Sequence, residues 1–329
     1  MPAPNRVTYA WRLIAMLERS GPAATDPTVL RAESNRRRRL SRLPIAQFVT
    51  GRFDRRAVAE DSFADLADGT TLSLRIYRPR SQGDRTLPVV VNFHGGGWVS
   101  GDPRQSDWWC SSVAAGAGVV VVSVDYRLAP EYPFPTAVED SYAATCWVVE
   151  RADALAVDAS RVAVMGDSAG GNLAAVVSLL ARDRGGPKIG LQVLIYPAVE
   201  MIDEFPSKAE NAEAPVLRAV DMDRHRDVYL NGADGSDPLA SPLRAEHAGL
   251  PPALIQTAQY DPLRDQGAAY ADALRSAGVD VRLTNYADAV HGYASIPGLV
   301  PQASQALADA VEEIGRAFAA DPASDAAER

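Results

Sequence analysis

The chain has 329 residues, of which 47% are hydrophobic and 23% are charged, and its formal net charge is −9 at pH 7. This composition is ordinary for a globular protein, and the length is sufficient for a sizeable core. The acidic balance argues against a nucleic-acid partner, because binding to phosphates needs a strongly basic face.

The N-terminal segment RVTYAWRLIAMLERSGPAA predicts an amphipathic helix. Arg12 interrupts the apolar stretch that a signal peptide would need. The apolar residues recur at helical spacing: Val7, Trp11, Ile14 and Leu17. The arginines at 36–39 favour a solvated helix face over a nuclear-localisation or polyanion patch. No run of about 18 apolar residues occurs, so we expect no membrane span.

Predicted strands begin near residue 57. Residues 57–79 alternate apolar and polar on both sides of Asp68-Gly69, which favours a tight turn, and they predict an antiparallel hairpin. Six β-branched-rich runs come after it, and most are continuously apolar, as strands buried on both faces must be. They are LPVVVNFHG (87–95), GVVVVSVDY (118–126), RVAVMGD (161–167), LQVLIYP (191–197), PALIQTAQYD (252–261) and VRLTNYAD (281–288).

Helical stretches separate these strands, at about 106–117, 135–152, 170–182, 266–277 and 302–318. Strands that alternate with helices predict an α/β fold, with a parallel sheet covered on both faces. We expect a single domain over residues 1–329 and a fraying tail from about Asp321. Residues 1–50 and about 200–240 do not follow the alternation, and we expect them to form a lid beside the sheet.

The segment VAVMGDSAGGN (162–172) places a serine between glycines directly after a predicted strand. A sharp strand-to-helix turn would lift Ser168 above the sheet, and Gly166 and Gly170 would leave room for neighbouring backbone. A bare Gly-x-Ser-x-Gly match is weak evidence, since the serine could instead cap the helix that begins at Gly170. The strand before it and the helix after it favour Ser168 as a nucleophile.

A serine hydroxyl needs a base to take its proton, and that base is usually a histidine. The sequence has four histidines. His291 comes after the last predicted strand, where functional groups gather in such sheets. We interpret His225, in the presumed lid, and His247, in a polar loop, as surface residues. His94 is interpreted as a residue that fixes its own loop by a hydrogen bond.

The histidine in turn needs a carboxylate to orient it. Asp261 ends a predicted strand in IQTAQYDPLRDQG and is the predicted acid. Asp265 is the competing acid, although we expect it to help start the next helix, and Asp288 is interpreted as a solvated loop residue. The chain order Ser168, Asp261, His291 is the order described for α/β-hydrolases.

The segment FHGGGW (93–98) supplies three consecutive glycines after a strand. Backbone N–H groups there can approach the oxygen that becomes negative during acyl transfer, and each is worth about 3 to 4 kcal/mol. The residue after the nucleophile, Ala169, supplies a further N–H. A phosphate-binding loop is the alternative, but the Lys-Ser/Thr ending of a P-loop is absent.

Five ordered motifs over about residues 70–315 resemble the hormone-sensitive-lipase-like branch (bacterial family IV) of the α/β-hydrolases. They are His94-Gly95-Gly96-Gly97-Trp98, Asp125-Tyr126-Arg127-Leu128-Ala129-Pro130-Glu131, Gly166-Asp167-Ser168-Ala169-Gly170-Gly171-Asn172, Asp261-Pro262-Leu263-Arg264-Asp265 and His291-Gly292-Tyr293. The resemblance implies an eight-stranded, mostly parallel sheet with a helical cap built from about residues 1–50 and 200–240. It also implies hydrolysis of short- to medium-chain carboxylic esters without a cofactor.

Carried over by position, the resemblance assigns the catalytic and oxyanion-hole residues. The catalytic residues are Ser168, Asp261 and His291, and the oxyanion donors are the amides of Gly96, Gly97 and Ala169, with Gly95 left open. The sequence departs from the family at Gln266, where Glu is usual after Asp265. We expect little effect from this change, because the position starts a helix. The cap sequences match no pattern, so substrate size and shape stay open.

Three functions fit these residues: a serine carboxylesterase, an acyltransferase on the same triad, and a ligand-binding protein. Plant gibberellin receptors resemble this family but lack the catalytic histidine, and the presence of His291 favours an enzyme. A cap over the groove favours an esterase over a lipase for long triglycerides. Aromatic residues near the catalytic loops are candidates for an acyl pocket or simply for the core: Trp98, Trp108, Trp109 and Tyr196.

The chain contains two cysteines, Cys110 and Cys146. They provide neither a disulfide framework nor spaced zinc ligands. We therefore expect no metal site and a cytoplasmic location, and the family resemblance implies that there is no cofactor. The expected partner is a small-molecule ester, and a homodimer is an option that the sequence leaves open.

Overall fold

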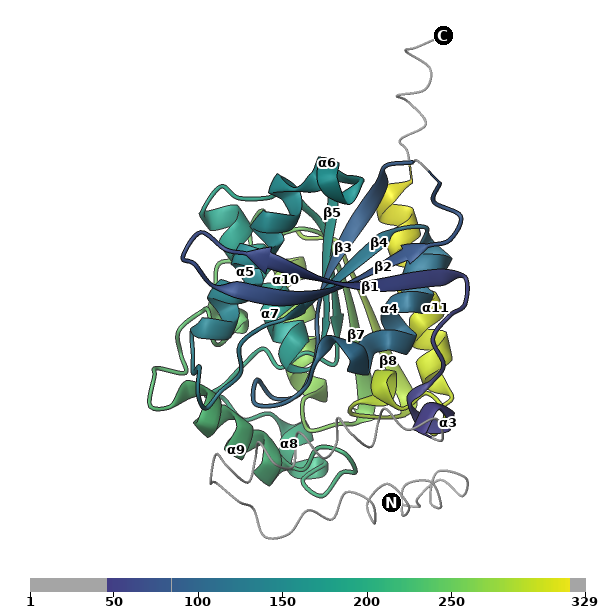
Figure 1. Cartoon of the computed structure of the whole chain (residues 1–329). Helices are drawn as coiled ribbons and strands as arrows, with labels where there is room; N and C mark the ends of the chain where they lie inside the picture. The colour runs from purple at the N-terminus through teal and green to yellow at the C-terminus, as the bar shows by residue number, and fades with distance from the viewer. Residues whose placement is uncertain (1–45, 84, 320–329) are drawn as a thin grey trace.

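The computed structural model describes residues 46–83 and 85–319. Its strands form one eight-stranded sheet in the order β1-β2-β4-β3-β5-β6-β7-β8 (Figure 1). The strands are β1 (Ala57–Asp65), β2 (Thr71–Pro79), β3 (Leu87–Phe93), β4 (Val120–Asp125), β5 (Val157–Asp167), β6 (Ile189–Ile195), β7 (Ala253–Tyr260) and β8 (Val281–Val290). β2 pairs antiparallel with β1 and β4, and the other neighbours are parallel. The predicted α/β fold with a mostly parallel sheet is confirmed.

Helices cover both faces of the sheet. The α-helices of the described residues are α3 (Gln47–Thr50), α4 (Asp107–Ala117), α5 (Thr136–Glu150), α6 (Ala152–Leu155), α7 (Ala169–Asp183), α8 (Pro206–Glu210), α9 (Ala219–Leu230), α10 (Arg264–Ser276) and α11 (Gln302–Phe318). Helices α5, α7 and α10 lie on one face, and α4 and α11 lie on the other (Figure 1). The alternation of strands and helices read from the sequence therefore gives the three layers that it predicted.

The central strands are apolar because both of their faces are buried. Every residue of β3 is buried, and the buried side chains divide into two apolar clusters, one on each face of the sheet. Complete burial of an aliphatic side chain contributes about 1.5 to 3 kcal/mol. A rigid sheet results, and the ends of its strands can hold functional groups in fixed positions.

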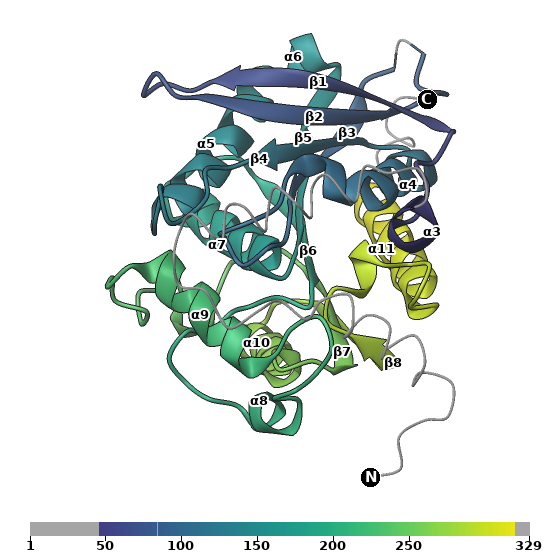
Figure 2. The same cartoon turned by 60° about the horizontal axis from the view of Figure 1, so that its bottom comes forward.

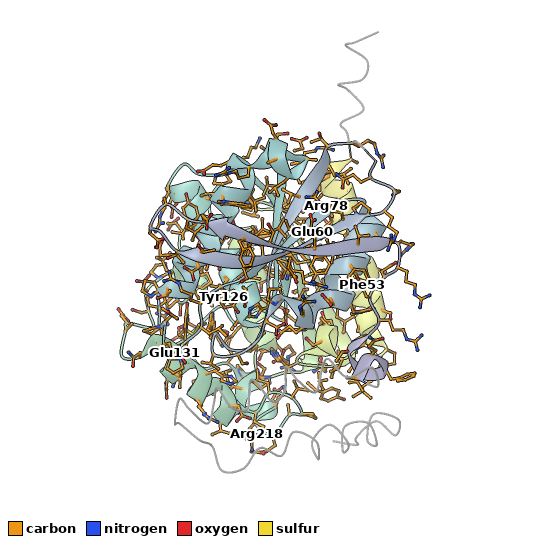
Figure 3. The ribbon with its side chains drawn as sticks, in the orientation of Figure 1. Phe53, Glu60, Arg78, Tyr126, Glu131 and Arg218 are labelled. Carbon is orange, nitrogen blue, oxygen red and sulfur yellow. The ribbon has the colours of Figure 1, made fainter. Side chains whose placement is uncertain are left out.

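The predicted hairpin is present at the edge of the sheet. Gly69 has φ 84°, and the Thr70 amide donates to Asp68 Oδ1 at 2.9 Å, which fixes the turn between β1 and β2. Across the hairpin, Arg78 of β2 and Glu60 of β1 form an ion pair at 3.4 Å (Figure 3).

The segment of residues 200–240 contains α8 and α9, which lie together at the side of the molecule away from the hairpin (Figure 2). The predicted N-terminal helix, the arginines at 36–39 and the tail from Asp321 lie outside the described residues. Within the described ranges, the helices are too short or too polar to cross a membrane.

Candidate active site

Ser168 lies in the sharp turn between β5 and α7. Its backbone has φ 56° and ψ −117°, a strained conformation for a residue with a side chain. A Cβ on Gly166 would lie 2.1 Å from the Gly170 carbonyl oxygen, and a Cβ on Gly170 would lie 1.9 Å from the Phe93 carbonyl oxygen. The glycines therefore allow the turn to pack against β3. The Ser168 side chain makes no capping hydrogen bond to α7, so the alternative of a helix-capping serine is wrong.

Two hydrogen bonds connect Ser168, His291 and Asp261. Nε2 of His291 lies 2.9 Å from Oγ of Ser168, and Nδ1 of His291 lies 2.8 Å from Oδ2 of Asp261. Asp261 is fully buried and His291 is 6% exposed. The Leu263 amide donates to the second oxygen of Asp261 at 2.8 Å. This geometry allows a serine proton to move to an imidazole whose other nitrogen is held by a buried carboxylate.

The other two aspartates considered as acids do not contact His291. Asp265 accepts a hydrogen bond from the Ser207 amide at 2.9 Å and forms an ion pair with Arg264, so it ties α10 to α8. Asp288 is exposed to solvent. Of the three aspartates, the structure brings only Asp261 to the histidine.

The glycine-rich loop after β3 is fixed at the Gly95 peptide. Its N–H donates to Oδ1 of Asp167 at 2.8 Å. Its carbonyl oxygen lies 3.0 Å from Nε2 of Gln105 and 2.9 Å from Nδ1 of His94, which donates in the tautomer protonated at that nitrogen. The loop-fixing bond expected of His94 is present, whereas Gln105 was missed. A capping box from Asp102 to Gln105 is the sequence signal that could have indicated it.

The Gly95 amide is engaged with Asp167, so it is not available as an oxyanion donor. For the amides of Gly96, Gly97 and Ala169, the described part of the chain offers no acceptor. Gly96 has φ 127° and Gly97 has φ 61°, both in the region that favours glycine. Ala169 is the first residue of α7, and the N-terminal end of a helix attracts negative charge.

Asp167 lies between the glycine-rich loop and the histidine. Burial raises the pKa of its carboxyl to about 6, while the Gly95 amide and the charge of protonated His291 act in the opposite direction. The Tyr196 hydroxyl lies 3.4 Å from Oδ2 of Asp167, and the Tyr196 ring centroid lies 4.7 Å from that of His291. The charge of Asp167 is therefore coupled to both the loop and the histidine.

A cavity of about 800 Å³ opens over Ser168 and His291. This volume is typical of small-molecule sites. The apolar side chains in its wall include Trp98, Met201, Leu217, Met222, Leu263 and Ile296. Charged side chains of the segment of residues 200–240 also line the cavity: Asp203, Glu204, Lys208, Asp223 and Arg226. Lys208 bonds to both Glu204 and Asp223, which links α8 to α9.

The interpretation of His225 and His247 as surface residues is wrong. His225, in α9, is half-buried and lines the cavity, with its ring against Gly97 of the glycine-rich loop. His247 is 8% exposed, its Nε2 lies 3.1 Å from the Pro242 carbonyl oxygen, and burial lowers its pKa. Both are covered because the segments that carry them fold back onto the molecule, which no local sequence pattern signalled.

The four aromatic residues considered for an acyl pocket divide into two groups. Trp98, Trp108 and Tyr196 line the cavity. Trp109 is 3% exposed and packs in the core, where its Nε1 lies 3.3 Å from Sδ of Met165.

Known proteins have similar sequences. A family model described as alpha/beta hydrolase fold matches residues 90–295. Carboxylesterase NlhH of Mycobacterium tuberculosis is 44% identical over 272 residues, which cover 81% of this chain and 83% of that protein. Ethyl acetate hydrolase of Pseudomonas putida is 38% identical over 271 residues, which cover 81% of this chain and 85% of that protein.

Solved structures have a similar fold. A hyperthermophilic esterase from the archaeon Pyrobaculum calidifontis superposes with a TM-score of 0.85 at 38% sequence identity. The superposition covers 96% of this chain and 99% of the archaeal one.

Proposed function

The chain belongs to the hormone-sensitive-lipase-like esterases of the α/β-hydrolase fold, and from that membership we propose a role for each active-site residue. The protein is a carboxylic ester hydrolase that acts on small esters. In our proposal Ser168 is the nucleophile, His291 the base and Asp261 the orienting acid. The observation that supports this most directly is the pair of hydrogen bonds, 2.9 and 2.8 Å long, that joins them.

Acylation begins when Oγ of Ser168 attacks the ester carbonyl carbon and its proton moves to Nε2 of His291. Asp261 holds the proton on Nδ1 and stabilises the imidazolium. The amides of Gly96, Gly97 and Ala169 stabilise the new negative charge on the carbonyl oxygen by donating hydrogen bonds to it. The bond to the alcohol oxygen then breaks, and His291 gives its proton to the departing alcohol.

Deacylation repeats the same steps with water. A water molecule loses a proton to His291 while its oxygen bonds to the acyl carbon. The bond to Ser168 breaks, the serine recovers its proton from His291, and the carboxylic acid leaves. Each step is a proton transfer or an acyl transfer, so no cofactor is required.

The segment of residues 200–240 is proposed as the cap that limits the substrate to short- and medium-chain esters. Its helices α8 and α9 contribute to the cavity wall, as does Gln47 of α3. Residues 1–45 of the proposed N-terminal cap segment lie outside the described residues. Both cysteines are free thiols, which supports the predicted cytoplasmic location. A homodimer stays a prediction.

Replacement of the nucleophile tests the proposal. Ser168→Ala should lower kcat for p-nitrophenyl butyrate by at least about 1000-fold, because the acyl-enzyme cannot form. Ser178→Ala is the matched control in α7, the helix that follows Ser168, since the Ser178 hydroxyl donates to the Ala174 carbonyl oxygen and Ser178 does not line the cavity. Substantial turnover in folded Ser168→Ala would contradict the mechanism. Product analysis with an added alcohol measures how much acyl group goes to acceptors other than water.

A further inference from the structure

Gln266, in the first turn of α10, has one end of its side-chain amide fixed by the protein. Its side chain is buried, with 3% of the residue exposed, and it lines the cavity. The amides of Val199 and Glu200 donate to its Oε1 at 3.1 and 3.2 Å. Only the oxygen can accept two N–H donors, so these bonds determine which end of the amide is oxygen.

The other end of the amide is Nε2, which has no acceptor within the described residues. It is nevertheless not one of the side-chain atoms that are buried without a partner. It therefore retains accessible surface, and the space that Gln266 borders is the cavity. The wall thus presents an N–H donor that the protein itself does not use.

The carboxylate of Glu200, in the same wall of the cavity, has hydrogen-bond donors within the protein for both of its oxygens. Glu200 accepts from the amides of Ile202 and Asp203 at 2.7 and 3.1 Å through one oxygen, and from Arg244 at 2.8 Å through the other. Apolar residues such as Met201 and Leu263 line the cavity as well. An N–H donor in apolar surroundings strengthens the binding of a ligand that offers it an acceptor. It weakens the binding of a ligand that excludes water from it and offers no acceptor.

We propose that Gln266 is a specificity-determining residue that donates a hydrogen bond to an acceptor on the substrate other than the reacting ester. The favoured substrates are then esters with an ether or keto oxygen in their acyl or alcohol part. This inference rests on the proposed esterase function and adds a substrate class to it. A glutamate at this position could keep both bonds to the Val199 and Glu200 amides, but its second oxygen would be an acceptor where Gln266 has a donor.

Gln266→Glu is the matched test, because it can preserve the two acceptor bonds to the backbone amides while it replaces the Nε2 donor by an acceptor that carries a negative charge. The measurement is kcat/KM at pH 8 for pairs of esters that differ by one oxygen. The acyl pairs are p-nitrophenyl methoxyacetate with butyrate and p-nitrophenyl 4-oxopentanoate with pentanoate. The alcohol pair is 2-methoxyethyl butyrate with butyl butyrate. For each pair, kcat/KM of the oxygenated ester is divided by kcat/KM of the apolar ester. Comparing this ratio between wild type and variant removes the difference in intrinsic reactivity between the two esters.

We expect at least one ratio to fall by about tenfold or more in Gln266→Glu, since a hydrogen bond is replaced by repulsion between two acceptors. The pair that responds identifies whether the acyl or the alcohol part is recognised. Gln266→Leu lacks the donor and adds no charge, so it should lower the same ratio. It also removes the acceptor of the Val199 and Glu200 amides, so its folding is checked by circular dichroism, and either folded variant decides the proposal. Unchanged ratios in all pairs overturn the proposal. That result would leave the esterase function intact, because Ser168→Ala tests it separately.

Discussion

Gly170 lies so close to β3 that a single methyl group at this position would overlap the Phe93 carbonyl oxygen. Ser168 is strained beside it, and the Gly95 peptide is held by Asp167 on one side and Gln105 on the other. The reactive geometry therefore depends on backbone positions that particular residues permit or fix. Substitutions at these residues should act on stability and activity in distinguishable ways.

The first prediction concerns two glycine substitutions. Gly170→Ala should lower the free energy of unfolding by about 3 kcal/mol or more, because backbone atoms of β3 cannot move away. Gly315→Ala is the control in α11, where a Cβ meets no atom within 4 Å, and it should raise stability by about 0.5 to 1 kcal/mol. Urea unfolding measures both. Equal effects of the two changes would contradict the steric explanation of the turn.

The second prediction concerns the carboxyl of Asp167, a half-buried residue that lines the cavity. Its pKa is raised from 3.8 to about 6 by burial, so the folded protein holds this proton more tightly than the unfolded chain. The stability that it contributes is complete below pH 3.8 and is lost as the pH rises through about 6. Asp167→Asn still offers an acceptor to Gly95 and should be more stable than wild type at pH 8, by at most about 3 kcal/mol.

Urea unfolding at pH 5 and pH 8 measures this difference. Asp288→Asn, at an exposed aspartate, is the control and should follow the wild-type pH dependence. If Asp167→Asn and wild type lose the same stability between pH 5 and pH 8, the carboxyl is not the titrating group.

Among the elements, α9 connects the proposed cap to the glycine-rich loop. Its Tyr229 stacks on Trp98 with ring centroids 4.4 Å apart and planes 6° apart, and it meets the edge of Phe134 at 5.7 Å. The Phe134 amide also donates to the Tyr229 carbonyl oxygen at 2.9 Å. Because Trp98 is the next residue after Gly97, a substitution at the end of α9 should alter the positions of the oxyanion donors.

The third prediction separates the ring of Tyr229 from its hydroxyl. Tyr229→Ala should lower stability by about 3 to 5 kcal/mol and raise KM, because the cap loses its aromatic contact with the loop. The hydroxyl is buried without a hydrogen-bond partner among the described residues, so Tyr229→Phe should be neutral or stabilising by about 1 kcal/mol. Thermal unfolding and steady-state kinetics measure both variants. A large loss of stability in Tyr229→Phe would show that the hydroxyl, and not the ring, stabilises the contact between α9 and the loop.

On the scale of the whole molecule, the sheet gathers groups from distant parts of the chain at one edge. β5, β7 and β8 end next to Ser168, Asp261 and His291, and the parallel arrangement directs all three ends toward the same cavity. Segments from both the glycine-rich loop and the proposed cap complete the wall. We predict that the size of this cavity limits the range of substrates.

The fourth prediction is a limit on chain length. In a series of p-nitrophenyl esters, kcat/KM should be highest for short and medium acyl chains and fall at least about tenfold from octanoate to palmitate. The reason is that a cavity of about 800 Å³ must hold the acyl chain and the alcohol part together. To exclude effects of micelles, the assay contains no detergent and uses substrate concentrations at which the esters are monomeric. Equal kcat/KM for palmitate and octanoate would show that the cavity opens to long chains.

The sequence alone determined the order of strands and helices, the hairpin at Asp68-Gly69 and the turn that carries Ser168. These features depend on residues a few positions apart, through alternation, turn propensity and the space that glycine leaves. The order of Ser168, Asp261 and His291 was also readable, because parallel strands bring the residues beyond their carboxyl ends to one edge of the sheet. Their roles in catalysis stay a prediction until the variants are measured.

Only the tertiary structure decided the contacts between segments far apart in the chain. It engaged the Gly95 amide with Asp167, placed His225 against Gly97, and buried His247. It also bonded Oε1 of Gln266, a residue of the cavity wall, to the amides of Val199 and Glu200. Such contacts depend on how helices and loops pack over the sheet, and packing is a property of surfaces that local sequence patterns do not encode.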